Sequence, residues 1–319
     1  MVSSTCFLIA HDKFLKTVAN RFEHGILKIV DSKRRNNMVR IITDSASDFE
    51  PQEFEALGVD YASLYVYFGD EEYKENVTLT KNQFYEMLQE KKMAPRTSLP
   101  SLHDIECLMK DAMEAGDEMV IIPISSGLSG TCQSFATVKD MLEYDDCYIV
   151  DSLTGTGGVR LLVEYAVKLR DQGKSGKEIA DAVAKMRSRV TLYTVMDTLE
   201  FLMRGGRISK SSYVVGTLVN IKPIMHVNLE GKPEIPAKVR GMRKGIDFCC
   251  KMITETPPDP EFPVTVMYTY DRSNGEKLAE ALRGLGHEVS DDRIVPVGAV
   301  VGSHIGPNAC AIVYIAKEQ

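Results

Sequence analysis

Hydroxyl side chains gather in a short glycine-containing segment of this sequence that could bind an anion. Residues 125–131 read SSGLSGT, follow an apolar run and precede a helical pattern. In an open α/β sheet this place is the carboxyl end of a strand, where ligands bind, and the first N–H groups of the next helix favour negative charge. Gly130 would let the backbone approach a ligand closely, and Ser129 would add a neutral donor. A capped turn without a ligand is the competing interpretation.

A second hydroxyl segment, TSLPS at residues 97–101, has the same character. Ser101 is typical of a helix N-cap because Asp104 follows three residues later. Thr97 and Ser98 have no such local role, so they either contact a ligand or belong to a polar loop.

Three basic or imidazole side chains are further candidates. Arg207 follows two glycines, a setting that suits a phosphate or carboxylate, and Arg240 follows a predicted strand. His304 lies in a glycine-flanked segment between two predicted strands and could contact a ligand. Each of these side chains could equally be a surface group or a structural one.

Carboxylates end two predicted strands, at Asp44 and Asp151. Such a group could bind a metal, a ribose or a hydroxyl, or it could cap the next turn. No two of the six histidines have metal-ligand spacing, so no metal site is expected. Neither a G-x-x-x-x-G-K-[ST] phosphate loop nor a G-x-S-x-G nucleophile elbow occurs, so no bound cofactor and no catalytic residue are predicted.

The 319 residues carry a formal net charge of −7, which argues against a nucleic-acid partner and against attraction to an anionic membrane. Seven cysteines without a C-x-x-C pair favour reduced thiols in a cytoplasmic protein. We expect no transmembrane segment because no apolar run approaches ~20 residues. The first residues do not resemble a signal peptide.

The elements that must position these side chains follow from the apolar pattern. Residues 1–37 end in a basic cluster and are expected to be a weakly ordered extension or to lie upstream of a true start at Met38. Strands are predicted at 39–43, 59–68, 118–124 and 148–151, alternating with helices such as 102–113, which indicates a parallel α/β domain over residues 38–190. Further strands at 191–196, 223–228, 233–239, 264–270, 293–301 and 310–316, with a hairpin turn at 230–232, predict a smaller α+β domain of mostly antiparallel strands over residues 191–319.

Taken in order, these segments resemble the DegV family over everything except the first 37 residues. The matching segments are TDSASD at 43–48, TSLPS at 97–101, SSGLSGT at 125–131, DS at 151–152, GGRISK at 205–210, IKPI at 221–224, Arg240 with Arg243, and SHIGP at 303–307. The sequence departs from the family at Ile305, where a small or hydroxyl residue is common, and at Asn308, where glycine is common.

The resemblance implies a two-domain fold with a fatty acid buried in the N-terminal domain. It implies a non-catalytic role as the acyl-binding subunit of a bacterial fatty-acid kinase, whose separate catalytic subunit phosphorylates the carboxylate with ATP for phospholipid synthesis. By the same resemblance, the carboxylate is bound by Thr97, Ser98, Ser129, Gly130 and His304, whereas Arg207 and Arg240 face the kinase subunit or the new phosphate.

Two rival functions stay open at this point. Ser129 and His304 could form a nucleophile–base pair that hydrolyses acyl esters. The chain could also be a lipid sensor or storage protein that has no kinase partner.

Overall fold

The computed structural model describes residues 38–209 and 220–318, and residues 39–319 group into one compact unit. The predicted extension at residues 1–37 and the last residue of the GGRISK segment lie outside the described residues. The division into domains at residue 190 stays a prediction.

A four-stranded parallel sheet forms the first layer, as the alternating pattern predicts. Its order is β2-β1-β6-β7, with β1 at Val39–Asp44, β2 at Val59–Ala62, β6 at Glu118–Ile121 and β7 at Cys147–Ile149. Because all four strands run in one direction, their carboxyl ends share one edge, and the hydroxyl segment at residues 125–131 follows the end of β6.

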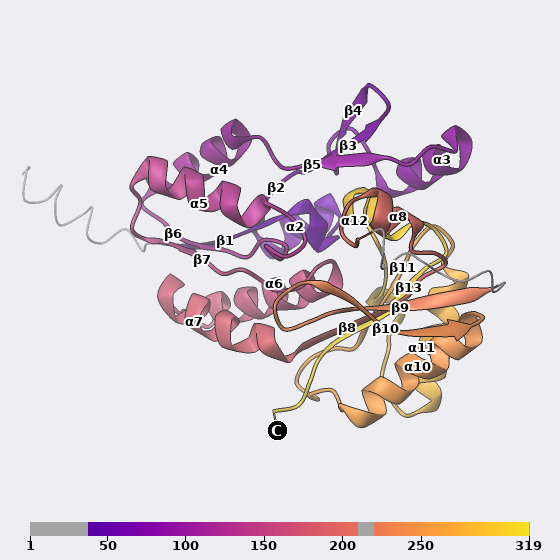
Figure 1. Ribbon diagram of the computed structural model, residues 1–319. Coiled ribbons are helices and arrows are strands. Elements are labelled where there is room, and N and C mark those ends of the chain that lie inside the picture. Colours follow the sequence, from indigo (N-terminus) through magenta and orange to yellow (C-terminus); the bar gives the residue numbers. More distant parts are fainter. Residues whose placement is uncertain (1–37, 210–219, 319) are drawn as a thin grey trace, which may run out of the picture. The chain divides into compact units, whose positions relative to one another are not determined.

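Helices cover both faces of this sheet (Figure 1). Helices α4 (Leu102–Ala115) and α5 (Thr131–Leu142) pack on one face, and α6 (Gly157–Asp171) and α7 (Gly176–Met186) on the other. The predicted N-cap at Ser101 is confirmed, since its side chain accepts a bond from Asp104 N–H. Ser175 forms a capping box with Glu178 at the start of α7. Thr80 does the same with Gln83 at the start of α3 (Lys81–Lys91).

A second, six-stranded sheet has the order β10-β9-β8-β13-β11-β12 and is antiparallel except for the β11–β12 pair. The strands are β8 (Val190–Val195), β9 (Ile221–Val227), β10 (Pro233–Arg240), β11 (Thr265–Tyr268), β12 (Ile294–Pro296) and β13 (Cys310–Ile315). Helices α10 (Met242–Glu255) and α11 (Ser273–Gly284) cover one face, while α6 packs on β8 and β13 as well as on β1 (Figure 1). Helix α6 therefore lies between the two sheets.

The predicted strand at 59–68 is wrong as a single element. It breaks after β2, and residues Tyr65–Phe68 form β3 in a separate small sheet. The break is held by a hydrogen bond of 3.1 Å from Leu64 N–H to Ser45 Oγ. In the small sheet β3 pairs with β4 (Glu71–Lys74) and with β5 (Arg96–Ser98), so Thr97 belongs to an edge strand and not to a loop.

The predicted strand at 293–301 is also wrong in its second half. Strand β12 ends at Pro296, and residues Ala299–Ile305 form helix α12, which carries His304. The remaining short elements are η1 (Ser45–Ser47), α2 (Pro51–Leu57), η2 (Arg187–Arg189), α8 (Glu200–Arg204) and η3 (Asp291–Arg293). Within the described ranges, none of the helices has the length and apolarity that a membrane crossing requires.

Candidate functional site: an apolar cavity with a polar wall

A cavity of about 350 Å³ lies between loops of the first sheet and strands of the second. This volume is within the usual range for ligand pockets, roughly 300–1,000 Å³. Most of its wall is aliphatic: Leu64, Leu99, Ile124, Leu128, Leu192, Leu202, Met225, Val227, Pro233, Val300, Val301 and Ile305. An aliphatic wall of this kind suits a hydrocarbon chain, because burial of apolar surface is its main source of affinity.

Polar side chains from several elements line the same cavity. Thr97 of β5 shares a hydrogen bond of 2.9 Å between its Oγ1 atom and His304 Nε2 of α12. Arg207, just beyond α8, donates from Nε to the carbonyl of Leu128 over 3.0 Å. Ser129 follows Leu128 and also lines the cavity, so two hydroxyls, an imidazole and a guanidinium face one space.

The hydroxyl segment is held in place by two strand-end carboxylates. Asp44 accepts N–H bonds from Ile124 at 2.8 Å and Ala46 at 3.0 Å, and Asp151 accepts one from Ser126 at 3.2 Å. Burial raises the pKa of Asp44 to about 7, although these N–H groups oppose the shift. Of the two interpretations of these aspartates, the capping one therefore describes the structure.

Ser129 is oriented by its neighbour in the chain. Its Oγ atom lies 2.8 Å from Thr131 Oγ1 and accepts the N–H of Thr131 at 3.3 Å. Gly130 directly before α5 is exposed and is not among the residues that line the cavity, and Ser98 lines it at an exposed position.

The hairpin between β9 and β10 closes over the hydroxyl segment. Ser125 donates from Oγ to the carbonyl of Gly231 at 2.9 Å. A Cβ atom on Gly127 would stand 2.5 Å from the same carbonyl, and Gly231 has a left-handed φ of 74°. Both positions therefore require glycine, and the hairpin backbone packs directly on the hydroxyl segment.

His304 is neutral over the physiological pH range. Burial lowers the pKa of its imidazole to about 3, and the positive charge of Arg207 adds to this effect. Its Nδ1 atom is buried, and no described residue forms a hydrogen bond to it. Gly205 packs against this side of the ring: a Cβ atom there would stand 2.7 Å from Cε1 and closer still to Nδ1.

Gly205 is the C-cap of α8, but its backbone is not left-handed. Its φ is −73°, whereas the next residue, Gly206, has a φ of 73°. Glycine at position 205 is required by the neighbouring imidazole and not by the turn.

The two arginines that sequence analysis grouped together lie in different places. Arg207 is half-buried in the cavity wall beside His304, and burial lowers its pKa from the usual value. Arg240 ends β10 at an exposed position and does not line the cavity.

Sequence reasoning missed Thr156, which lines the cavity and precedes α6. Its φ of 46° is unusual for a β-branched residue, and its hydroxyl donates a hydrogen bond to buried Asp48. Thr156 lies in the glycine-rich segment GTGG at residues 155–158, and these glycines were the only feature of the sequence that pointed to an unusual backbone there. Of the residues that the structure describes, no three His, Cys, Asp or Glu side chains are grouped as a metal site would require.

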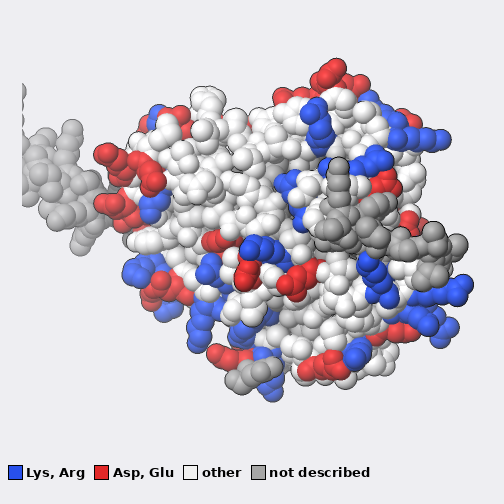
Figure 2. All heavy atoms as spheres, viewed as in Figure 1, with Lys and Arg blue, Asp and Glu red and all other residues white. Residues whose placement is uncertain are grey.

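The face shown in Figure 2 carries charges of both signs. Acidic and basic side chains both occur along its edges and near its centre.

Comparison with known proteins identifies relatives of nearly the same length. Residues 38–317 match the family model described as "Uncharacterised protein, DegV family". A DegV domain-containing protein of Clostridium acetobutylicum is 31% identical over 280 residues, which cover 88% of this chain and 99% of the relative. A DegV domain-containing protein of Streptococcus pyogenes is 34% identical over 289 residues, with 88% and 98% covered.

Solved structures agree with the fold. A DegV family protein from Thermus thermophilus, described by its fatty acid binding, superposes with a TM-score of 0.80 at 27% identity and covers 88% of this chain and all of its own. DegV from Bacillus subtilis, described as a fatty acid binding protein, has a TM-score of 0.75 at 25% identity, with 88% and 100% covered.

Proposed function

This chain belongs to the DegV family, and from that premise we propose that it binds one long-chain fatty acid and presents the carboxylate to a separate kinase subunit. The observation that carries the proposal is an aliphatic cavity whose wall also carries neutral hydroxyl and imidazole side chains, with Thr97 and His304 hydrogen-bonded to each other. A fatty acid has the same two parts, and related structures are described as fatty-acid-binding proteins.

The apolar tail supplies most of the affinity. About 14 methylenes would gain roughly 11 kcal/mol when buried, at about 0.8 kcal/mol each. Ordering the flexible chain and losing its free motion offset much of this gain. Burial of the tail therefore holds the ligand in the cavity, and the polar side chains fix the position of its carboxylate.

The carboxylate is bound chiefly by neutral donors in this proposal. The contact between Thr97 and His304, and the position of Ser129 beside Leu128, support a shared role for these side chains, with Ser98 and the N–H of Gly130 as further contacts. A carboxylate that accepts hydrogen bonds from neutral groups keeps its nucleophilic charge. Arg207 lies beside this group, so it is placed to attract the carboxylate as well as a phosphate.

The chemical step belongs to the partner in this proposal. A carboxylate oxygen attacks the γ-phosphorus of ATP held by the kinase subunit, the bond to the bridging oxygen breaks, and ADP leaves with that electron pair. The product is an acyl phosphate for phospholipid synthesis. Arg240 is exposed, which suits a contact with the kinase subunit, and a cytoplasmic location belongs to the same proposal.

Two measurements test the proposal in sequence. Mass spectrometry of lipid extracted from the purified protein should find one fatty acid per chain, and absence of any bound lipid together with no uptake of added palmitate would overturn it. Acyl-phosphate formation should then require ATP, the protein and a fatty-acid kinase subunit together. ATP turnover by the homogeneous chain alone would contradict the carrier role.

The hydrolase alternative is not favoured by the geometry. His304 Nε2 is engaged with Thr97, and Ser129 Oγ is engaged with Thr131, so the two residues of the supposed pair each bond elsewhere. An imidazole with a pKa of about 3 is also a poor general base near neutral pH. A lipid sensor or storage protein without a kinase partner would also bind fatty acid. It would differ from our proposal only in forming no acyl phosphate with a kinase subunit and ATP.

A further inference from the structure

Two buried carboxylates hold the start of the helix that carries His304. Asp48 Oδ1 accepts the N–H of Gly298 at 3.0 Å, and Glu75 Oε1 accepts the N–H of Val300 at 3.0 Å. Gly298 precedes α12 and Val300 is its second residue. Both acceptors are therefore aimed at N–H groups that lack partners within the helix.

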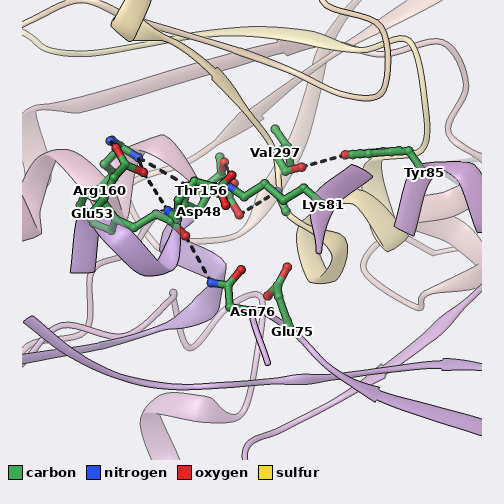
Figure 3. Close-up of polar contacts among 12 residues, drawn as sticks. Asp48, Glu53, Glu75, Asn76, Lys81, Tyr85, Thr156, Arg160 and Val297 are labelled. Atoms are coloured by element: carbon green, nitrogen blue, oxygen red, sulfur yellow. Dashed lines mark hydrogen bonds and ion pairs between the residues drawn. The ribbon is translucent and has the colours of Figure 1, made fainter. Parts of the chain in front are cut away.

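These carboxylates come from a polar cluster inside the protein (Figure 3). The side chain of Asp48 also accepts a hydrogen bond from the hydroxyl of Thr156, and its backbone carbonyl accepts one of 2.7 Å from Lys81 Nζ. Arg160 lies on the other side of Asp48 and pairs with Glu53. The cluster thus joins a residue of the cavity wall, Thr156, to the start of α12.

Burying two carboxylates so completely is costly. Asp48 has 0% of its surface exposed and Glu75 has 1%. Burial raises the pKa of Asp48 to about 6 and that of Glu75 to about 7. A buried carboxylate is costly unless it is hydrogen-bonded, and both of these are bonded to the start of α12. The proposed binding of a fatty acid does not use either of them directly.

We propose that Asp48 and Glu75 are positioning residues that fix α12, and through it the imidazole of His304, for recognition of the ligand carboxylate. This inference rests on the proposed function. Both carboxylates bond α12 at its first turn, and His304 lies in its last turn.

The packing around α12 explains how a change at its start reaches His304. The helix has seven residues and so spans roughly 10 Å at 1.5 Å per residue, which makes it too short to bend. A Cβ atom on Gly302 would stand 2.6 Å from the hydroxyl of Tyr85, and that hydroxyl donates to the carbonyl of Val297 at 3.1 Å. With its middle held this closely, we expect weaker first-turn bonds to let the helix tilt and to move its other end.

The test uses three variants of the full chain that each replace a carboxylate by an amide of the same shape. Asp48→Asn and Glu75→Gln leave a neutral amide oxygen to accept the N–H groups of α12, which is a weaker acceptor than a carboxylate. Glu53→Gln is the matched control, because Glu53 belongs to the same cluster through Arg160 but bonds the start of its own helix α2 and none of the described residues of α12.

The first readout is the affinity for palmitate beside that for its methyl ester. The ester keeps the tail and lacks the carboxylate charge, so the ratio of the two affinities isolates recognition of the head group. We expect this ratio to fall about 3- to 30-fold in Asp48→Asn and Glu75→Gln, a part of the loss caused by removing one bond to a charged group. Glu53→Gln should leave the ratio unchanged even if its melting temperature falls.

The second readout is the nitrogen NMR signal of the His304 ring in the ligand-free protein, assigned with His304→Gln. The ring nitrogen signal depends on the hydrogen bond between His304 and Thr97. If α12 moves, that bond changes, so the signal should shift in Asp48→Asn and Glu75→Gln but not in Glu53→Gln. If Asp48→Asn and Glu75→Gln lose equal affinity for palmitate and for its methyl ester, and the His304 ring signal does not move, the positioning role is wrong. If the unaltered protein binds neither lipid, the proposed function fails, and the ring signal by itself still decides whether these carboxylates position His304.

Discussion

Replacing Gly205 by alanine should displace His304 without altering the backbone. The φ of Gly205 is −73°, a value that alanine adopts freely, so any effect must come from the added methyl group. That methyl group would stand 2.7 Å from His304 Cε1. Carbon atoms prefer separations of about 3.5–4.0 Å, so the imidazole has to retreat by roughly 1 Å.

A shift of this size has two measurable costs. Overpacking of this kind destabilises a protein by about 1–3 kcal/mol. The 2.9 Å bond between His304 and Thr97 is also lost or weakened, and with it the donor that we assign to the ligand carboxylate. One hydrogen bond to a charged group is worth about 1.5–3 kcal/mol, which corresponds to roughly 10- to 100-fold weaker binding of fatty acid.

The assay is displacement of a fluorescent fatty acid by palmitate, beside thermal unfolding. Gly284→Ala is the control, since a Cβ atom there would meet nothing within 4 Å and the residue ends helix α11. That control should bind normally and unfold at the same or a slightly higher temperature. If Gly205→Ala is folded and binds palmitate within about twofold of the unaltered protein, His304 does not recognise the carboxylate and our reasoning is wrong.

Three further results are expected. Ser129→Ala should weaken fatty-acid binding roughly 10- to 100-fold in the same assay, and full affinity would exclude Ser129 from the site. Arg207→Ala should lower both fatty-acid affinity and acyl-phosphate formation, whereas Arg240→Ala should lower only acyl-phosphate formation in the presence of the kinase subunit; lipid loss in Arg240→Ala would contradict this division. Burial raises the pKa of Glu75 from 4.5 to about 7, so the folded state binds this proton more tightly than the unfolded state, and stability is lost as the pH rises from 4.5 to 7. The free energy of unfolding should therefore be measured with urea at pH 5 and pH 8 for Glu75→Gln and for the unaltered protein. From pH 5 to pH 8 the variant should become more stable relative to the unaltered protein by on the order of 1–3 kcal/mol. A difference that does not change with pH would refute the raised pKa of Glu75.

The parallel sheet and the hydroxyl segment could be predicted because their signals are local. Apolar runs alternate with capped amphipathic helices, and the segment at residues 125–131 directly follows one such run. Strand β5 could not be predicted, since its three residues carry no apolar pattern and become a strand only by pairing with β3. Thr97 lines the cavity, but the sequence did not show that it lies in a strand.

Helix α12 was missed for a related reason. The sequence AVVGSHI is rich in residues that favour strands, and it follows a true strand. The helix depends in part on acceptors for its first N–H groups. Asp48 and Glu75 supply these acceptors, and they are 250 and 225 residues away in sequence from the N–H groups that they bind. A pattern read within a window of a dozen residues does not contain such contacts.

The position of α6 between the two sheets determines how the molecule must unfold. Nine of its fifteen residues are buried, and its contacts reach β1 on one side and β8 and β13 on the other. A fragment ending at residue 190 would expose the face of α6 that packs on β8 and β13, and a fragment starting at 191 would lack the helix on that face of its sheet. We therefore expect the two sheets to unfold in one cooperative transition, so calorimetry should find equal van't Hoff and calorimetric enthalpies for the chain that contains both.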